Sequence, residues 1–212
     1  MPFTVYCDLL EMLSPYMFRK VLDDKVLYDL LLPNIRLPQR IASCCEGVAY
    51  SYSEEGERQE VHYDVMLNNI ANLRDVIIKP SKGSSAGLGV KCFTSIDGII
   101  KDSDQTVKQL LDGYHGNFVI EKKITNNDNL KVLNPSSCNT LRIHTWRDRT
   151  NGKIEFISAF LRVGRNGSII DNGFAGGIAI PIGDDGKLNN SGCTLKNYKR
   201  IEHSDTGITF NG

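Results

Sequence analysis

The residues best suited to chemistry lie in a loop rich in glycine and serine, KPSKGSSAGLGV, at residues 79–90. Gly83, Gly87 and Gly89 allow backbone N–H groups to approach phosphate oxygens without an intervening Cβ, and serine hydroxyls add further donors. Lys79 supplies a positive charge where an apolar run ends. The pattern lacks GxxxxGK[ST] and precedes a β-like run, which excludes a P-loop and a Rossmann fingerprint. On composition alone, an ordinary mobile hairpin loop is the alternative.

Further features along the chain suit the same chemistry. Lys25 precedes a helix-like segment, and an apolar strand ends in Glu121, where backbone groups can meet a purine edge. Arg142 and Arg162 lie on β-like segments, and the stretch DNGFAGG follows at residues 171–177. Two lysines and two arginines on separate segments suit the clamping of a polyanion during phosphoryl transfer. Surface lysines, structural ion pairs and a plain turn are the alternatives.

The elements that must position these residues begin with helices. Apolar residues at helical spacing predict two helices over residues 5–32, broken at Ser14-Pro15, with the second capped near Asp23. Further helices are predicted at 60–73 and at 103–113, the latter capped by Ser103 or Asp104. The buried stripe of the second helix is expected to comprise Leu22, Val26, Leu27, Leu30 and Leu31.

The remaining two thirds of the chain are β-rich. Hairpin-type turns at Asn151-Gly152 and Asn166-Gly167 indicate antiparallel neighbours, so the predicted fold class is α+β. Trp146 is expected in the core. Strands are predicted at 40–42, 76–78, 90–94, 118–121, 140–147, 154–164 and 168–182.

The totals describe an ordinary soluble globular chain of 212 residues. Lys plus Arg is 25 and Asp plus Glu is 25, a balance that argues against binding to nucleic acid or to anionic membranes. No apolar run approaches the roughly 20 residues of a membrane span, and no basic region suggests a signal peptide. The six cysteines include no CxxC pair, which disfavours a zinc ribbon and indicates reduced, cytoplasmic thiols.

Taken in order, these pieces resemble the ATP-grasp superfamily: a lysine before a helix, a strand ending Lys-Pro, a glycine-rich lid, a strand ending in Glu, an arginine strand and Asn-x-x-x-Gly-Gly. The stretch NPSSCNTLRIHTW…RVGRNGSIIDNGFAGGI resembles the sugar-transfer-associated ATP-grasp family, whose members occur with capsule and lipopolysaccharide synthesis proteins. The resemblance covers about residues 20–212. It implies the ATP-grasp fold, with a helical extension at 1–22, a small subdomain at 23–125 and part of a large subdomain at 126–212.

The resemblance also assigns roles by position. Lys25 and Lys79 match the lysines that hold the α- and β-phosphates of ATP. Arg142 and Arg162 match positions near the γ-phosphate and the acyl phosphate, and Asn172 borders the reacting centre, so these three form the expected catalytic set. The nucleotide-binding set is completed by the lid residues Ser81, Gly83, Ser84, Ser85, Gly87 and Gly89, and by the linker to adenine and ribose, Glu121, Lys122, Lys123 and Ile124.

Magnesium is expected for the family, but its late ligand pattern, an Asp strand followed by Glu-x-Asn, is not found after Gly177. Asp184, Asp185, Glu202 and Asp205 fall in turn-rich sequence, and no metal ligand is assigned. We therefore expect a chain that stops before the metal-binding end.

Three functions stay open at this point. The first is an ATP-dependent carboxylate–amine ligase that works through an acyl phosphate in surface-polysaccharide assembly, with a small carboxylate or a sugar-linked acceptor. The second is a non-catalytic nucleotide-binding or interaction module. For the protein in general, a missing C-terminal half or glycan-synthesis proteins are expected as further partners. The third is a plain structural domain with a mobile glycine loop.

Overall fold

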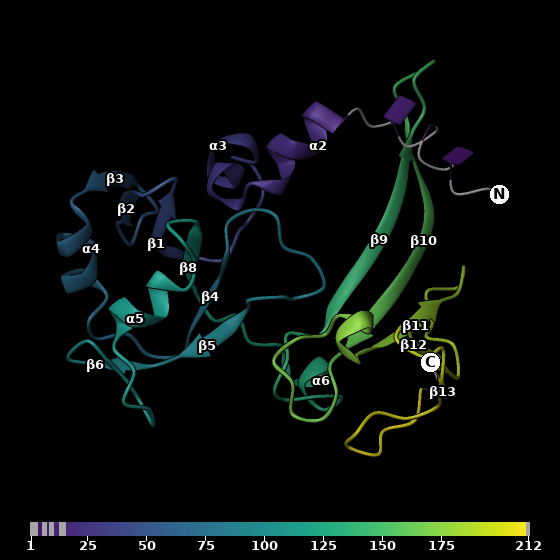
Figure 1. Cartoon of the computed structure of the whole chain (residues 1–212). Helices are drawn as coiled ribbons and strands as arrows, with labels where there is room; N and C mark the ends of the chain where they lie inside the picture. Colours follow the sequence, from purple (N-terminus) through teal and green to yellow (C-terminus); the bar gives the residue numbers. More distant parts are fainter. Residues whose placement is uncertain (1–3, 6–7, 9–10, 13–15, 211–212) are drawn as a thin grey trace. The chain divides into compact units, whose positions relative to one another are not determined.

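The structure is a computed structural model that describes residues 4–5, 8, 11–12 and 16–210 (Figure 1). The chain forms two compact units, Met1–Lys123 and Ile124–Gly212, and each is described by itself. The first predicted helix falls largely outside the described residues, and so does the expected break at Ser14-Pro15. In the described part of the chain, no helix combines the length and the apolar composition that a membrane crossing requires.

Six strands of the first unit, counted over the described residues, form one antiparallel sheet in the order β3-β2-β1-β8-β4-β5. β8 comes last in the sequence but lies inside the sheet, between β1 and β4. The strands are β1 (Arg40–Cys45), β2 (Val48–Tyr52), β3 (Arg58–Val61), β4 (Val76–Pro80), β5 (Lys91–Phe93) and β8 (Phe118–Lys122), beside a small hairpin of β6 (Ser95–Ile96) and β7 (Ile99–Ile100).

One face of this sheet is apolar and covered. Ile78, Phe118 and Ile120 belong to a buried core with side chains of α4 (Tyr63–Asn69) and α5 (Val107–Asp112), which lie alongside the sheet (Figure 1). Both helices are shorter than predicted. The predicted N-cap of α5, Ser103 or Asp104, is wrong, because Thr106 forms the capping box with Gln109.

The opposite face of β4 and β8 carries charge. Side chains alternate between the faces of a strand, so Lys79 and Glu121 point away from the core that holds Ile78 and Ile120. The direct partner of Glu121 on β4 is Ile77. Lys79 therefore lies diagonally across from Glu121, within reach of its carboxylate.

A bulge in β1 decides what stands opposite Glu121 on the other side. Arg40 pairs with Glu121 and Ala42 pairs with Ile120, so β1 has one extra residue, Ile41, between them. Strict alternation would place Arg40 on the core face with Ala42. The extra residue turns Arg40 to the charged face instead.

The second predicted helix is not continuous. α2 (Tyr16–Asp23) is followed by a three-residue 3-10 helix, η1 (Lys25–Leu27), and by a single turn, α3 (Tyr28–Leu31). Asp24, one residue beyond the expected cap at Asp23, accepts a hydrogen bond from a backbone amide of η1 at 3.0 Å. The segment thus changes its helical period at Asp24.

This change of period explains why the expected buried stripe is partly wrong. Val26 is 2% exposed, whereas Leu22, Leu30 and Leu31 are 53%, 61% and 43% exposed. A 3-10 helix has about three residues per turn, so side chains spaced for an α-helix no longer share a face. Val26 is consequently the residue that anchors the segment in the unit.

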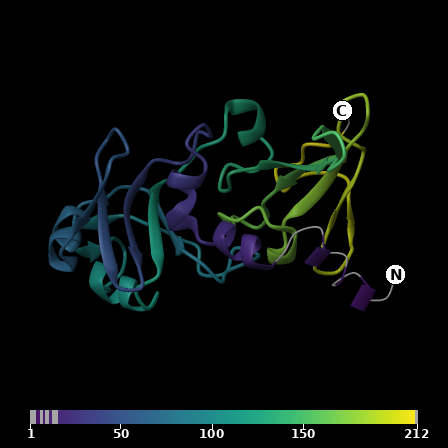
Figure 2. The same ribbon diagram turned by 90° about the horizontal axis from the view of Figure 1, so that it is seen from above.

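In the described residues of the second unit, five strands form an antiparallel sheet in the order β13-β12-β11-β10-β9. β9 and β10 run side by side as a long hairpin in both views (Figures 1 and 2). The core contains Leu161, Val163, Ile178 and Ile180. The elements are α6 (Asp128–Lys131), β9 (Thr140–Arg147), β10 (Ile154–Val163), η2 (Gly173–Ala175), β11 (Ile178–Ile182), β12 (Gly192–Thr194) and β13 (Arg200–Ile201).

The antiparallel α+β class is confirmed, and two details of the second unit are corrected. The strand predicted at 168–182 is confined to β11, because residues before it form a loop and the 3-10 helix η2. Trp146 is 40% exposed and does not belong to the core. It lies near the end of the β9–β10 hairpin, beyond the part of β10 that packs into the core.

Candidate nucleotide-binding site

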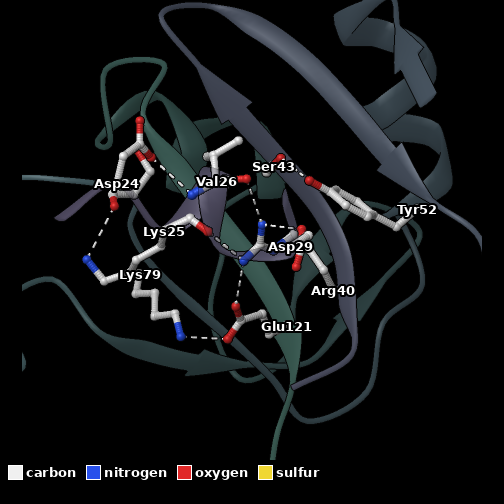
Figure 3. Close-up of polar contacts among 10 residues, drawn as sticks. Asp24, Lys25, Val26, Asp29, Arg40, Ser43, Tyr52, Lys79 and Glu121 are labelled. Atoms are coloured by element: carbon white, nitrogen blue, oxygen red, sulfur yellow. Dashed lines mark hydrogen bonds and ion pairs between the residues drawn. The ribbon is translucent and has the colours of Figure 1, made fainter. Parts of the chain in front are cut away.

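The charged face of the first sheet centres on the carboxylate of Glu121 (Figure 3). One oxygen, Oε2, accepts a hydrogen bond from Nζ of Lys79 at 2.6 Å, and the other, Oε1, lies 3.3 Å from a guanidinium nitrogen of Arg40. The side chains of Glu121 and Arg40 are only 6% and 3% exposed. A buried carboxylate is therefore shared between two cations from the neighbouring strands β4 and β1.

Arg40 also reaches the helical segment that precedes the sheet. Its NH1 lies 2.6 Å from Oδ2 of Asp29 and donates to the carbonyl of Val26 at 3.3 Å, and its NH2 donates to the carbonyl of Lys25 at 2.7 Å (Figure 3). Burial by itself would lower the pKa of Arg40, but Tyr52, Asp29 and Glu121 outweigh it and raise that pKa. The guanidinium thus stays charged and joins η1, α3 and β8.

Lys25 extends from η1 to the start of the glycine-rich loop. Its backbone amide donates to the carbonyl of Ser81 at 2.8 Å. Its Nζ lies 3.3 Å from the same carbonyl and 3.4 Å from Oγ of Ser84. Burial lowers the pKa of Lys25, and the nearby Lys79 ammonium acts in the same direction, whereas Asp23 opposes both. The Lys79 ammonium therefore lies close enough to act on the charge of Lys25, together with the carboxylates of Asp23, Asp24 and Glu121.

The loop itself presents donors at its beginning and is fixed at its end. Ser81 is fully buried, and its Oγ finds no hydrogen-bond partner among the described residues. The amide of Gly83, at a φ of 66°, donates to Oδ2 of Asp23 at 2.8 Å. The hydroxyl of Tyr114 donates to the carbonyl of Gly89 at 2.7 Å. A Cβ on Gly89 would stand 2.8 Å from Cγ of Pro80, so this close approach requires glycine.

The other predicted residues of the lid and of the linker are held mainly by backbone hydrogen bonds. The carbonyl of Ser85 accepts from Leu88 within the loop, and Gly87 takes a φ of 81°. The amide of Lys122 donates to the carbonyl of Gln39 at 2.8 Å, and that of Lys123 donates to Asp75 at 3.3 Å. Ile124, half exposed, is the first residue of the second unit. The backbone amides of Lys122 and Lys123 thus donate their hydrogen bonds within the first unit.

The second unit gathers another group around Arg162. Its Nε and NH2 donate to the hydroxyl of Thr140 at 3.0 and 2.7 Å, and NH2 lies 3.4 Å from Oδ2 of Asp171. The Thr140 hydroxyl in turn donates to Asp171. Arg162 and Thr140 are direct cross-strand partners on β10 and β9, so the sheet register places them together.

The other two predicted catalytic residues of this unit, Asn172 and Arg142, lie outside the hydrogen-bonded group around Arg162. Asn172 caps η2, since its side-chain oxygen accepts from the amide of Phe174 at 2.9 Å. Arg142 is exposed and stands two residues along β9 from Thr140, on the same face of the strand. Gly177 packs so closely on the carbonyl of Asp171 that no side chain fits there.

Comparison with known families assigns the chain that carries these side chains to a family. A family model described as sugar-transfer associated ATP-grasp matches residues 7–212. The chain belongs to the sugar-transfer associated ATP-grasp family. Searches of curated proteins and of solved structures give no match. The family match makes the chain an ATP-binding ATP-grasp domain.

Several groups beside the glycine-rich loop have the chemistry that a triphosphate requires. Lys25 and Lys79 supply two ammonium groups, and the buried Ser81 hydroxyl has hydrogen-bonding capacity that the described residues leave unused. Buried polar groups are normally satisfied, so this hydroxyl has an unused capacity for a hydrogen bond at the base of the glycine-rich loop.

The fit to magnesium is different. Over residues 4–5, 8, 11–12 and 16–210, no three His, Cys, Asp or Glu side chains come together in a way that could hold a metal ion. The described residues therefore include no carboxylate cluster that fits magnesium.

Two residues of the ATP-grasp domain were missed by sequence reasoning. Arg40 opens an apolar strand, RIASCC, and a charge at the start of a buried strand is a signal that it needs a partner. Thr140 gave no such signal, because threonine is ordinary in strands. Its role depends on the cross-strand register with Arg162.

Proposed function

We propose that this ATP-grasp domain holds the triphosphate of ATP with Lys25, Lys79 and the lid at 81–89, for phosphoryl transfer to a carboxylate. One observation carries the proposal: the Lys25 ammonium and the hydroxyls of Ser81 and Ser84 lie together at the base of the lid. Lys25 Nζ contacts the carbonyl of Ser81 and the hydroxyl of Ser84, and the buried Ser81 hydroxyl is unpartnered among the described residues. Cations and fixed donors of this kind favour a polyanion.

The proposed reaction is that of a carboxylate–amine ligase. A carboxylate oxygen bonds to the γ-phosphorus while the bond from that phosphorus to the bridging oxygen breaks, and ADP leaves. An amine then attacks the acyl carbon, phosphate leaves, and the amine nitrogen gives up a proton. A closed lid protects the acyl phosphate from water. Arg142, Arg162 and Asn172 are proposed to act on the transferred group.

The acceptor is proposed from the family description. That description associates the family with sugar transfer. We propose a sugar-linked amine or carboxylate used in surface-polysaccharide assembly, because such an acceptor supplies the functional group that the reaction requires.

Isothermal titration calorimetry with ATP tests the nucleotide site. Lys79→Met should weaken binding about 10- to 100-fold, because hydrogen bonds to charged groups contribute about 1.5–3 kcal/mol. The matched control is Lys91→Met, an exposed lysine on the neighbouring strand β5, which should bind as the wild type does. Equal affinities for all three proteins would contradict the proposal.

A turnover assay separates the ligase from a non-catalytic module. Release of ADP that depends on both a carboxylate and an amine acceptor supports the ligase. Tight ATP binding with no such release over a panel of sugar-linked acceptors favours the nucleotide-binding module instead.

A further inference from the structure

Arg40 lies outside every group of residues expected to bind the nucleotide, yet it is among the most enclosed charges of the first unit. Its side chain is 3% exposed. It contacts the carbonyls of Lys25 and Val26 on one side and the carboxylate of Glu121 on the other. The contacts therefore connect η1, which carries Lys25, with Glu121 on β8, whose carboxylate also pairs with Lys79.

On the helical side, Arg40 contacts the segment that carries Lys25. η1 is only three residues long, and one turn of helix does not hold its own orientation. Two of its carbonyls accept hydrogen bonds from the fork of one guanidinium, at 2.7 and 3.3 Å. A planar fork with fixed donors limits how η1 can rotate. The Lys25 side chain, which leaves η1 toward Ser81 and Ser84, is limited with it.

On the sheet side, Arg40 and Lys79 share the carboxylate of Glu121. Arg40 lies at Oε1 of Glu121, and the Lys79 ammonium lies at Oε2 (Figure 3). Because the carboxylate is rigid and buried, fixing one oxygen fixes the position that the other offers to Lys79. The bulge at Ile41 is what brings Arg40 to this face.

We propose that Arg40 is a positioning residue that sets the places of Lys25 and Lys79 for the triphosphate without contacting the nucleotide. The inference rests on the proposed function for its biological purpose, but the placement of the two lysines can be measured without ATP. A lysine at position 40 keeps the charge and loses the fork, so it cannot serve η1 and Glu121 together.

The first measurement is the rate at which an amine-acylating reagent modifies each lysine, followed over pH by peptide mass spectrometry. In the Arg40→Lys protein, the limiting rates of Lys25 and Lys79 at high pH, where both amines are neutral, should rise several-fold above those of the wild type, because the side chains are less closely held. The midpoint for Lys25 should move up toward that of an ordinary lysine. Arg58→Lys is the matched control, because Arg58 is on the same sheet and stacks on Tyr50 at 4.7 Å. It should leave both rates unchanged.

The second measurement is ATP affinity by calorimetry on the same proteins. Arg40→Lys should weaken binding about tenfold, and Arg58→Lys should not change it. Asp29→Asn is a milder variant for the case in which Arg40→Lys does not fold, since it loosens Arg40 from one contact only. It should change lysine reactivity in the same direction by a smaller factor.

The outcomes separate the two proposals. Wild-type reactivity at both lysines in a folded Arg40→Lys protein, or in the Asp29→Asn protein where the first does not fold, overturns the positioning role, whether or not ATP binds. Altered reactivity in a protein whose wild type does not bind ATP supports the positioning role and overturns the proposed function. Altered reactivity together with weaker ATP binding supports both.

Discussion

The two units each place an acidic side chain beside arginine, but they do so at different depths. In the first unit, Glu121 is 6% exposed and lies between Lys79 and Arg40. In the second unit, Asp171 is 12% exposed and meets Arg162, which is 22% exposed, largely through the hydroxyl of Thr140. The first arrangement depends on charge balance in a buried place, and the second depends on a neutral hydroxyl that organises a half-open one.

This difference in burial indicates how strongly the stability of each unit depends on its acidic side chain. Removing one partner of a buried ion pair leaves an uncompensated charge, which is much more costly than losing an ion pair near water. The first unit should therefore depend on Glu121 for folding itself. The second unit should tolerate the loss of a charge better than the loss of its hydroxyl network.

The largest effect is expected when the charge of Glu121 is removed. Glu121→Gln should lower the free energy of unfolding by about 3–5 kcal/mol, because Lys79 and Arg40 then face a neutral amide in a buried place. Asp171→Asn, the equivalent change in the second unit, should cost only about 0.5–1.5 kcal/mol, because the asparagine can still accept from the Thr140 hydroxyl. Peptide-resolved hydrogen exchange in urea measures each unit in the same sample. Equal losses of stability in the two units would contradict the conclusion that the first unit depends more strongly on its acidic side chain.

An intermediate effect is expected at Thr140. Thr140→Val keeps the shape of the side chain but removes the hydroxyl between Arg162 and Asp171, and should cost about 1–3 kcal/mol. Thr145→Val, at an exposed position of the same strand, should stay within about 0.5 kcal/mol of the wild type. Fluorescence of Trp146, the single tryptophan, follows urea unfolding of this strand. A Thr140 variant as stable as the Thr145 variant would show that the hydroxyl organises nothing.

The smallest effect concerns the pH dependence of Lys25. Burial lowers its pKa below the ordinary value of 10.5, so the unfolded chain binds more protons than the folded one between the two pKa values. Stability due to Lys25 should therefore rise with pH in that window, as the cost of burying the charge disappears. Urea unfolding of the wild type and of Lys25→Met, compared at pH 7 and near pH 10, measures this trend.

The comparison between wild type and Lys25→Met also removes the contribution of tyrosines. Burial raises the pKa of Tyr28, so its contribution to stability falls as pH rises through the same region. This loss is common to both proteins. A stability of the wild type relative to Lys25→Met that stays constant, or that falls as pH rises, would contradict a buried, charged Lys25.

Much of the candidate site followed from local sequence. The strand ending in Lys79 and the strand ending in Glu121 were both predicted, as was the glycine-rich lid between them. The helical segment around Lys25 was predicted with the wrong period, because a capping aspartate and a 3-10 turn changed the spacing that the leucines suggested. Local patterns find strands and loops well when alternation is strong, and they fail where a short turn changes the repeat.

The sequence by itself determined the α+β class, the lid and the family to which the chain belongs. Only the tertiary structure decided that Arg40 shares Glu121 with Lys79 and that Thr140 lies between Arg162 and Asp171. The physical reason is the same in both units. Such contacts depend on strand order and register, and in β1 on one extra residue in a bulge. A shift of one residue turns a side chain to the other face, and no local pattern records it.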